Sequence, residues 1–216
     1  MTVRKIGLLG GTFDPVHNGH LQLAESALKE CNLDKVVFIP SAQPPHKESV
    51  SITPFRHRVA MLNLAGKYFN GFECNAIEGI LPKPSYTIDT LWALREYYQS
   101  DCQMYFMIGA DAFLDIPTWK SHHELLESVN IILSLRKGYK ETQLSELLQK
   151  LGYKSSDGSC YCSNSKKDIY ILEKIPEGFS SSGIRRKIYQ GDDVQLFLPE
   201  SVMSYIRKHK LYLSEK

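Results

Sequence analysis

Hydrophobic and polar residues follow two patterns along the chain, short apolar runs and longer stretches with a helical period. The first apolar run, residues 3–10, ends at a pair of glycines. The stretch after it places Leu21, Ala24, Leu28 and Cys31 three or four positions apart, which is the spacing of one helix face. This pattern predicts a strand, a loop and a helix.

The same succession recurs through the rest of the chain. Further strands are predicted at residues 36–40, 72–77, 104–109, 130–135 and 168–172. Further helices are predicted at residues 54–68, 87–98, 119–126, 142–153, 180–188 and 198–209. Strands that alternate with such helices predict an α/β fold, a doubly wound and mostly parallel sheet with helices on both faces.

The length of the chain fits one domain with a small appendage. We expect a single domain over residues 1–216, with the sheet in residues 1–178 and a small C-terminal helical part in residues 179–216. Three loops, at residues 10–20, 41–47 and 108–111, follow predicted strands. Because ligands in such sheets bind outside the carboxyl ends of the strands, these loops are expected to form the site.

Local signals mark several boundaries. Thr53 is the expected cap of the second helix, with Pro54 in its first turn, and Pro199 is expected in the first turn of the last helix. Residues 155–168 are rich in Ser, Gly and Asp and are therefore predicted to form a flexible loop.

Composition narrows the classes of partner. The 216 residues are 43% hydrophobic and carry a formal net charge of +2, too mild for bulk binding to nucleic acid or membrane. No apolar run approaches the roughly 18 residues of a membrane span, and the first apolar stretch is too short for a secretory signal. We expect a cytoplasmic protein with no nucleic-acid or membrane partner, and a homo-oligomeric state stays open.

Five cysteines, an odd number spread mostly over apolar segments, indicate reduced thiols rather than a disulfide framework. Only Cys160 and Cys162 have a spacing that suggests a metal. No second Cys or His pair lies near them, so a surface loop is favoured over a zinc site, and no protein metal ligand is expected.

The turn after the first strand combines two glycines with two histidines. Gly10 and Gly11 allow a tight turn and a close approach of a ligand to backbone amides at a helix start. His17 and His20 lie one helical turn apart. Together they predict a phosphate-binding turn, and the alternative is a glycine turn with two surface histidines. The spacing matches neither the dinucleotide motif nor the Walker motif.

A second helix start, far along the chain, carries arginines at the positive end of the helix dipole. If Ser182 caps this helix, Arg185 and Arg186 fall near its first turn, where a cation opposes the dipole. Such a placement is better explained if an anion lies there. With Lys47 in a proline-stiffened loop, the two helix starts favour polyphosphate binding over an ordinary serine-capped helix.

Three further positions have both a binding and a structural interpretation. Asp111 follows a buried strand, where it either accepts from ribose hydroxyls or a metal-bound water, or caps a helix. Trp119 either stacks on the ring of a ligand or, as the local pattern favours, only packs against other side chains of the protein. Thr87 is a plain cap whose backbone also faces the expected pocket. His122 and His123 are expected on an exposed helix face.

No residue has the context of an activated nucleophile. The chain contains no G-x-S-x-G elbow, and no cysteine stands in a histidine and acid pattern. The predicted chemistry is therefore a transfer that depends on positioning.

These motifs together resemble those of the nucleotidyltransferases with an H-x-G-H signature, here residues 17–20. Within that superfamily the chain is most similar to the bacterial nicotinate-nucleotide adenylyltransferases. The similar stretches are GGTFDPVHNGHL, PPHK, PSYTIDTL, IGAD followed by TW, FSSSGIRR and the ending LPESVMSYIRKHKLY. They span nearly the whole chain.

The resemblance implies a Rossmann-like fold and a reaction of NAD biosynthesis. In that reaction ATP and nicotinate mononucleotide give nicotinate adenine dinucleotide, also called deamido-NAD, and pyrophosphate. Mg²⁺ is expected with ATP, on the leaving pyrophosphate.

The resemblance also implies roles for individual residues. The catalytic phosphate contacts are expected from His17, His20, Lys47 and Arg185. ATP is expected to bind at Gly10, Gly11, Thr12, Phe13, Gly109, Asp111, Ser181 and Ser182. Nicotinate mononucleotide is expected to bind at Thr87, Trp119 and Arg136.

Two positions depart from the family pattern. Ser182 stands where threonine is more common, which keeps the hydroxyl, and Lys137 stands where proline is common beside Arg136. Two other functions stay open. One is a sibling enzyme with phosphopantetheine or nicotinamide mononucleotide as acceptor. The other is a nucleotide-binding regulator without catalysis, against which the complete set of basic phosphate ligands weighs.

Overall fold

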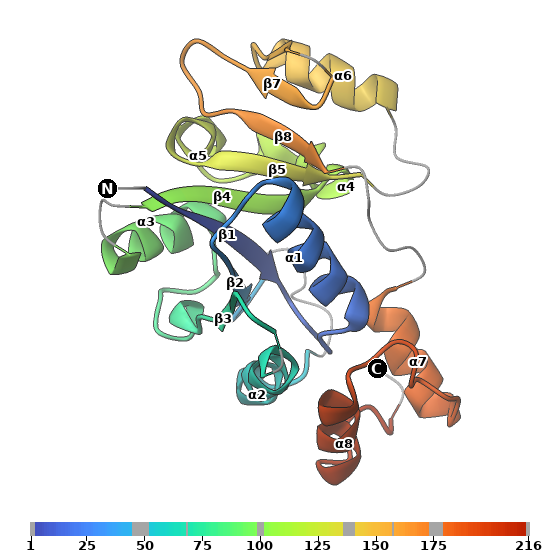
Figure 1. The fold of residues 1–216 in the computed structure, drawn as a ribbon. Helices are drawn as coiled ribbons and strands as arrows, with labels where there is room; N and C mark the ends of the chain where they lie inside the picture. Colours follow the sequence, from blue (N-terminus) through green and yellow to red (C-terminus); the bar gives the residue numbers. More distant parts are fainter. Residues whose placement is uncertain are drawn as a thin grey trace.

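The computed structural model describes residues 3–44, 52–67, 69–98, 102–135, 141–156, 158–172 and 179–214. Within them, an eight-stranded sheet runs through the centre of the molecule in the order β3-β2-β1-β4-β5-β8-β7-β6 (Figure 1). Its strands are β1 (Arg4–Gly11), β2 (Lys35–Pro40), β3 (Phe72–Cys74), β4 (Cys102–Gly109), β5 (Asn130–Ser134), β6 (Lys154–Ser155), β7 (Cys160–Cys162) and β8 (Ile169–Leu172). The strands from β3 to β8 in this order pair in parallel, and β7 and β6 continue the sheet antiparallel. The predicted α/β fold with a doubly wound, mostly parallel sheet is confirmed.

Helices cover both faces of the sheet. On one face lie α1 (Asn18–Glu30) and α2 (Phe55–Gly66), joined at the end of the chain by α7 (Ser181–Gln190) and α8 (Glu200–Lys208). On the other lie α3 (Thr87–Tyr98), α4 (Ala110–Phe113), α5 (His122–Ser128) and α6 (Glu141–Lys150), with the short 3₁₀ helices η1 (Ile77–Gly79) and η2 (Ile116–Thr118).

The central strands are buried on both sides, which explains their continuous apolar runs. In β4, Tyr105 and Met107 enter the core beneath α1 and α2, whereas Phe106 and Ile108 enter the core beneath α3 and α5. Successive strand side chains point to opposite faces, so a strand between two helix layers is apolar at every position.

The strand order reverses between β1 and β4, which pair in parallel although two strands separate them in the chain. After β1 the chain enters α1 on one face, and after β4 it enters α4 on the other. Such a reversal opens a crevice at the carboxyl ends of the strands, the usual ligand site of doubly wound sheets.

Three of the predicted boundaries are wrong. The strand predicted through residue 77 ends at Cys74, and Ile77 begins η1. Thr53 does not cap α2: Pro54 occupies the cap position with no side-chain cap bond. The Thr53 backbone is instead bonded to Asp14 and Arg58. At the last helix, Pro199 is likewise the cap residue and not part of the first turn.

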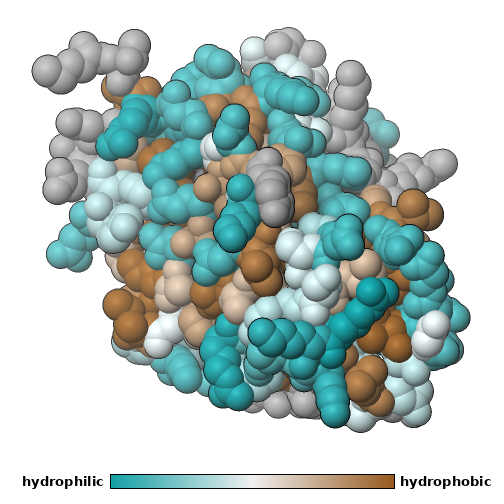
Figure 2. All heavy atoms as spheres, turned by 60° about the horizontal axis from the view of Figure 1, so that its bottom comes forward, coloured by the Kyte–Doolittle hydropathy of each residue, from teal (hydrophilic) through white to brown (hydrophobic). Residues whose placement is uncertain are grey.

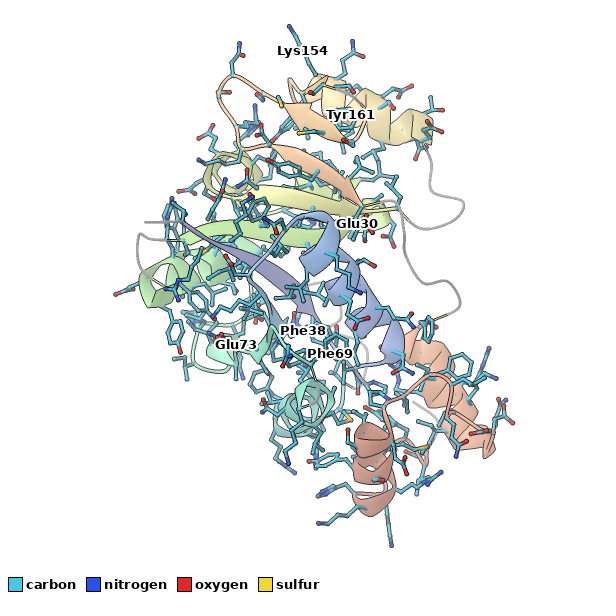
Figure 3. The ribbon with its side chains drawn as sticks, in the orientation of Figure 1. Glu30, Phe38, Phe69, Glu73, Lys154 and Tyr161 are labelled. Atoms are coloured by element: carbon cyan, nitrogen blue, oxygen red, sulfur yellow. The ribbon has the colours of Figure 1, made fainter. Side chains whose placement is uncertain are left out.

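Two other segments differ from prediction. The segment predicted as a flexible loop, residues 155–168, contains β7 and the end of a hairpin, because pairing with β8 orders it. The helix predicted from residue 119 begins at His122, since residues 116–118 form a 3₁₀ turn and Ser121 has a φ of 50°. Figure 3 labels Lys154 and Tyr161 on this hairpin, at the opposite end of the molecule from α8.

The C-terminal part of the chain forms hydrogen bonds with α1 and α2. The Tyr205 hydroxyl lies 2.9 Å from Nδ1 of His57 on α2, and the Ser201 hydroxyl donates to the Leu64 carbonyl at 3.2 Å. The backbone N–H of Asn18, the first residue of α1, donates to the Phe197 carbonyl at 2.9 Å. Figure 3 labels Glu30 at the far end of α1, so the first turn of α1 faces α7.

The face toward the viewer in Figure 2 carries hydrophilic and hydrophobic side chains intermixed. Among the described helices, none is long and apolar enough to cross a membrane.

Candidate active site

The turn between β1 and α1 is shaped by Phe13. Its backbone φ is 50°, and its ring is buried between His20, at 4.9 Å between centroids, and Phe38, at 5.6 Å. A Cβ added at Gly11 would lie 3.0 Å from this ring, which explains the glycine. The predicted residues Gly10, Gly11, Thr12 and Phe13 thus form the floor of the turn at the carboxyl end of β1, with the Phe13 ring buried and Gly10 exposed.

The histidine pair is held in one arrangement at the start of α1. The backbone N–H of His17, the cap residue, donates to Nδ1 of His20 at 3.3 Å, and the two rings stack 3.7 Å apart. A ring nitrogen that accepts carries no proton, so the neutral imidazole of His20 bears its proton on Nε2. His17 is 5% exposed, whereas His20 is half-buried. The orientation of the His20 ring at the helix start is therefore fixed.

The start of α7 lies against this same turn. The Ser181 hydroxyl donates to the Pro15 carbonyl at 2.9 Å, and Nη1 of Arg185 donates to the Asp14 carbonyl at 2.8 Å. Phe179 stacks with His17 at 5.9 Å between ring centroids. The structure thus brings together the two helix starts that the sequence marks as anion sites (Figure 1).

The cap of α7 corrects a prediction. Ser180, not Ser182, is the cap residue, and its hydroxyl accepts from the Gly183 backbone at 3.1 Å. Ser182 is exposed within the first turn, and Arg185 lies in the second. Together with Tyr212 and other residues, Ser182 and Arg185 line a cavity of about 440 Å³ beside α7.

A buried polar network supports the turn and was not found from the sequence. Both carboxylate oxygens of Asp14, which is 4% exposed, accept hydrogen bonds: Oδ2 from the Thr53 backbone at 3.1 Å, and Oδ1 from the Tyr212 hydroxyl at 2.7 Å. An acid within a turn otherwise rich in glycine and histidine was the available signal. Its partners lie too far along the chain for a local pattern to show.

Arg58 of α2 belongs to the same network. It is 1% exposed, and it donates to the Thr12 carbonyl at 2.8 Å and the Thr53 carbonyl at 2.9 Å. Burial lowers the pKa of the Arg58 guanidinium, and the negative charge of Asp14 acts in the opposite direction. A buried arginine with these partners stiffens the floor of the turn, because removing it leaves two carbonyls without their donor.

The end of β4 supplies the other side of the crevice. Gly109 is the cap residue of α4, and Asp111 is exposed in the first turn, so Asp111 is not the helix cap. A Cβ at Gly109 would collide with the Asp111 carboxylate. The predicted ATP-binding pair therefore lies next to the β1 turn, with its carboxylate on the surface.

Trp119 and Thr87 lie on the face of the sheet that α3 covers. Trp119 is half-buried, with its ring 6.3 Å from Phe106, and Thr87 is the first residue of α3. Lys120, next to Trp119, forms a 2.8 Å ion pair with Asp89 in the first turn of α3. This pair joins the two elements that carry the residues predicted for the mononucleotide.

The remaining predicted residues lie elsewhere. Lys47 and Arg136 are outside the described residues. Cys160 and Cys162, with sulfurs 3.8 Å apart, are on the β7 hairpin, remote from the helix starts. In the part of the chain that the structure describes, no group of three or more His, Cys, Asp and Glu residues could hold a metal.

Gly19 is required where α1 meets Phe179. A Cβ added at Gly19 would lie 2.7 Å from Cβ and 2.8 Å from Cγ of Phe179, atoms too close to the backbone to move freely. We expect Gly19→Ala to lower the free energy of unfolding by about 1–3 kcal/mol, the scale of overpacking, and to lower turnover. Thermal unfolding measures the effect. Gly10→Ala, whose Cβ would meet Phe106 at 3.6 Å, is the stability control, and an equal loss in both would contradict the steric account.

The fold and the two helix starts define a nucleotidyltransferase, and comparison with known proteins agrees. The family model described as Cytidylyltransferase-like matches residues 8–187. A probable nicotinate-nucleotide adenylyltransferase from Desulfotalea psychrophila is 46% identical over 216 residues, 97% of this chain and 100% of the relative. A second, from a Thermoanaerobacter species, is 38% identical over 98% of this chain and 96% of the relative. The chain belongs to the nicotinate-nucleotide adenylyltransferase family.

Solved structures share the fold. The Plasmodium falciparum nicotinic acid mononucleotide adenylyltransferase complexed with NaAD matches with a TM-score of 0.73 and 18% identity, over 98% of each chain. The same enzyme complexed with APC matches with a TM-score of 0.71. At this identity the likeness concerns the fold alone.

Proposed function

We propose that this nucleotidyltransferase transfers the adenylyl group of ATP to nicotinate mononucleotide, a step of NAD biosynthesis. The observation that carries the proposal is the meeting of the α1 and α7 starts at the crevice between β1 and β4. There the His20 imidazole and the Arg185 guanidinium are held by backbone bonds, without an activated nucleophile. Residues of this kind favour direct transfer between two bound anions.

The reaction forms one bond and breaks one. A phosphate oxygen of the mononucleotide attacks the α-phosphorus of ATP in line, and the bond from that phosphorus to the bridging oxygen breaks, so that pyrophosphate leaves with its electron pair. Both reactants are anions and repel each other in water. The protein therefore lowers the barrier by alignment and by donors placed where negative charge develops.

We assign the phosphates to His17, His20, Lys47 and Arg185. His20 has the more accessible ring of the pair, and its Nε2–H meets an anion without a change of tautomer. The ring of His17 fixes His20 by stacking. The backbone from Gly10 to Phe13, the Ser182 hydroxyl and the backbone N–H of Ser181 complete the phosphate contacts, since the Ser181 hydroxyl donates to the Pro15 carbonyl.

The two nucleosides are assigned to the two sides of the crevice. Gly109 and the exposed carboxylate of Asp111 suit the ribose hydroxyls of ATP. Trp119 is assigned to the pyridine ring and Thr87 to its carboxylate, through backbone amides. Arg136 is assigned to the phosphate of the mononucleotide.

We assign Mg²⁺ to the ATP phosphates, so that MgATP is the substrate. Mg²⁺ keeps several waters and binds mainly to substrate phosphates with one or two carboxylates. No described carboxylate is assigned as a protein ligand of the ion, because Asp14 accepts hydrogen bonds from Thr53 and Tyr212 and Asp111 is assigned to the ribose. When bound, the ion neutralises charge on the leaving pyrophosphate.

Acceptor specificity tests the proposal. Purified protein with MgATP is offered nicotinate mononucleotide, nicotinamide mononucleotide or phosphopantetheine, and pyrophosphate release is measured. We expect the highest kcat/KM with nicotinate mononucleotide, because a site built to pair a carboxylate discriminates by orders of magnitude. A higher value for another acceptor would indicate the sibling activity. ATP binding without pyrophosphate release for any acceptor would indicate a regulator.

Trp119 is predicted to serve the mononucleotide specifically. We expect Trp119→Ala to raise the KM for nicotinate mononucleotide roughly tenfold or more, the scale of one aromatic stacking contact of about 1–3 kcal/mol, with little change in the KM for ATP. Trp92→Ala is the matched control, since Trp92 lies 44% exposed on α3. An equal loss for ATP, or for both variants, would make Trp119 a packing residue only.

A further inference from the structure

The end of the chain returns to the catalytic turn through one tyrosine. Tyr212 lies beyond α8, yet it is only 5% exposed, and its hydroxyl donates to Oδ1 of Asp14 at 2.7 Å. Two residues of this short segment, Lys210 and Tyr212, have φ values of 50° and 64°. Residues other than glycine rarely adopt this backbone conformation, and it persists only where surrounding contacts hold it.

Asp14 connects three separate segments at the site. Its side chain accepts from Tyr212 of the C-terminal segment and from the backbone of Thr53, which precedes α2. Its carbonyl accepts from Arg185 of α7 at 2.8 Å. A shift of Asp14 would therefore move the Arg185 guanidinium relative to His17 and His20, which lie three and six residues further along the chain.

The electrostatics keep this arrangement in one state. Burial raises the pKa of the Tyr212 hydroxyl, and the charge of Asp14 adds to the shift, so Tyr212 remains a donor at any working pH. A buried carboxylate without its donors is costly, whereas one with several is fixed in position. The Tyr212 hydroxyl is one of the groups that set the orientation of the Asp14 carboxylate.

We propose that Tyr212 is a positioning residue for the reaction: by holding the Asp14 carboxylate it fixes the Asp14 carbonyl, and through that carbonyl the Arg185 guanidinium. The inference rests on the proposed function, since it assigns Arg185 to the phosphates. Tyr212 itself touches no substrate in this account. It acts through two hydrogen bonds in series, Tyr212 to Asp14 and Arg185 to Asp14.

The test compares two tyrosine hydroxyls of the same C-terminal part. Tyr212→Phe removes the bond to Asp14. Tyr205→Phe removes a hydroxyl that contacts His57 on α2 at 2.9 Å, and so weakens the docking of α8 without touching Asp14. We expect Tyr212→Phe to lower kcat by about tenfold or more, the scale of one bond to a charged group, with the KM for the acceptor within about twofold. Tyr205→Phe is expected to leave kcat within about twofold.

A double-variant measurement separates positioning from general structural support. In an Arg185→Ala background the guanidinium is gone, so Tyr212→Phe is expected to have almost no further effect on kcat. An additive loss in that background, or equal losses for Tyr212→Phe and Tyr205→Phe, would overturn the proposal. If Tyr212→Phe unfolds at the assay temperature, Asp14→Asn is tested in the same two backgrounds with the same expectation.

The proposed function is tested separately by the wild-type protein. All variants are assayed with the acceptor that the wild type uses best, and MgATP affinity is measured by calorimetry for each. If the wild-type protein showed no turnover with nicotinate mononucleotide, the proposed function would be refuted. A Tyr212→Phe variant that keeps wild-type kcat and MgATP affinity would refute the positioning role alone.

Discussion

His20→Ala is expected to lower kcat by about two to three orders of magnitude, the loss seen when one preorganised transition-state donor is removed. The reason lies in how the ring is held. The His17 backbone N–H donates to Nδ1 at 3.3 Å, and Phe13 packs against the ring at 4.9 Å, so Nε2–H needs no reorganisation to meet a developing charge. Steady-state kinetics with MgATP and the acceptor measure the effect.

The control for this variant is another histidine at a helix start. His123 is exposed on α5, on the face of the sheet away from α1, and His123→Ala is expected to change kcat less than about twofold. The melting temperature of His20→Ala should remain near that of the wild type, because the half-buried ring serves the substrate more than the core. A folded His20→Ala protein with near-normal turnover would refute the phosphate role of the histidine pair.

Arg185→Ala is expected to have an effect of the same size, about two to three orders of magnitude in kcat. One guanidinium N–H is bonded to the Asp14 carbonyl at 2.8 Å, which aims the planar group while its other donors can serve a phosphate. Lysine carries a compact ammonium and cannot hold the carbonyl and a bidentate phosphate contact in the same way. The kcat of Arg185→Lys is therefore expected to be less than about tenfold higher than that of Arg185→Ala.

Arg186 is the matched control for Arg185. It is the next residue of α7, is exposed, and lines the same cavity as Arg185, but the structure gives it no bond to Asp14. We expect Arg186→Ala to change kcat less than about threefold, with any effect fading as ionic strength rises. If Arg186→Ala lost more activity than Arg185→Ala, the assignment of the phosphates to Arg185 would be wrong.

Much of the fold could be predicted because it depends on local patterns. The helix over residues 87–98 begins and ends as predicted, and the buried strands β1, β2 and β4 follow from continuous apolar runs. The histidine pair was visible for the same reason, since a spacing of three residues places two rings together wherever a helix starts.

What the sequence did not show depends on distant partners. Three consecutive serines, residues 180–182, each satisfy a cap pattern, and only the backbone conformation selects Ser180. Residues 160–162 form a strand because β8 lies beside them. The Asp14 and Tyr212 side chains are bonded across 198 positions of the chain, and Arg58 reaches Thr12 across 46.

The residues that sequence reasoning missed are therefore those that support the proposed catalytic residues. Arginine is rarely buried, so Arg58 gave no apolar signal and no helix pattern predicted its role. The charged groups that we assign to the phosphates stood out instead, because nothing within their own helix explains them. Supporting networks of this kind can be identified only in the structure. Candidate phosphate ligands can be identified in the sequence, as basic residues at the positive end of a helix.

The most direct test of the central claim is a crystal structure of the protein with a non-hydrolysable ATP analogue and Mg²⁺. The account predicts that phosphate oxygens lie between the starts of α1 and α7, within about 3 Å of Nε2 of His20 and of the Arg185 guanidinium. A triphosphate bound beside α7 with no contact to His20 would contradict it.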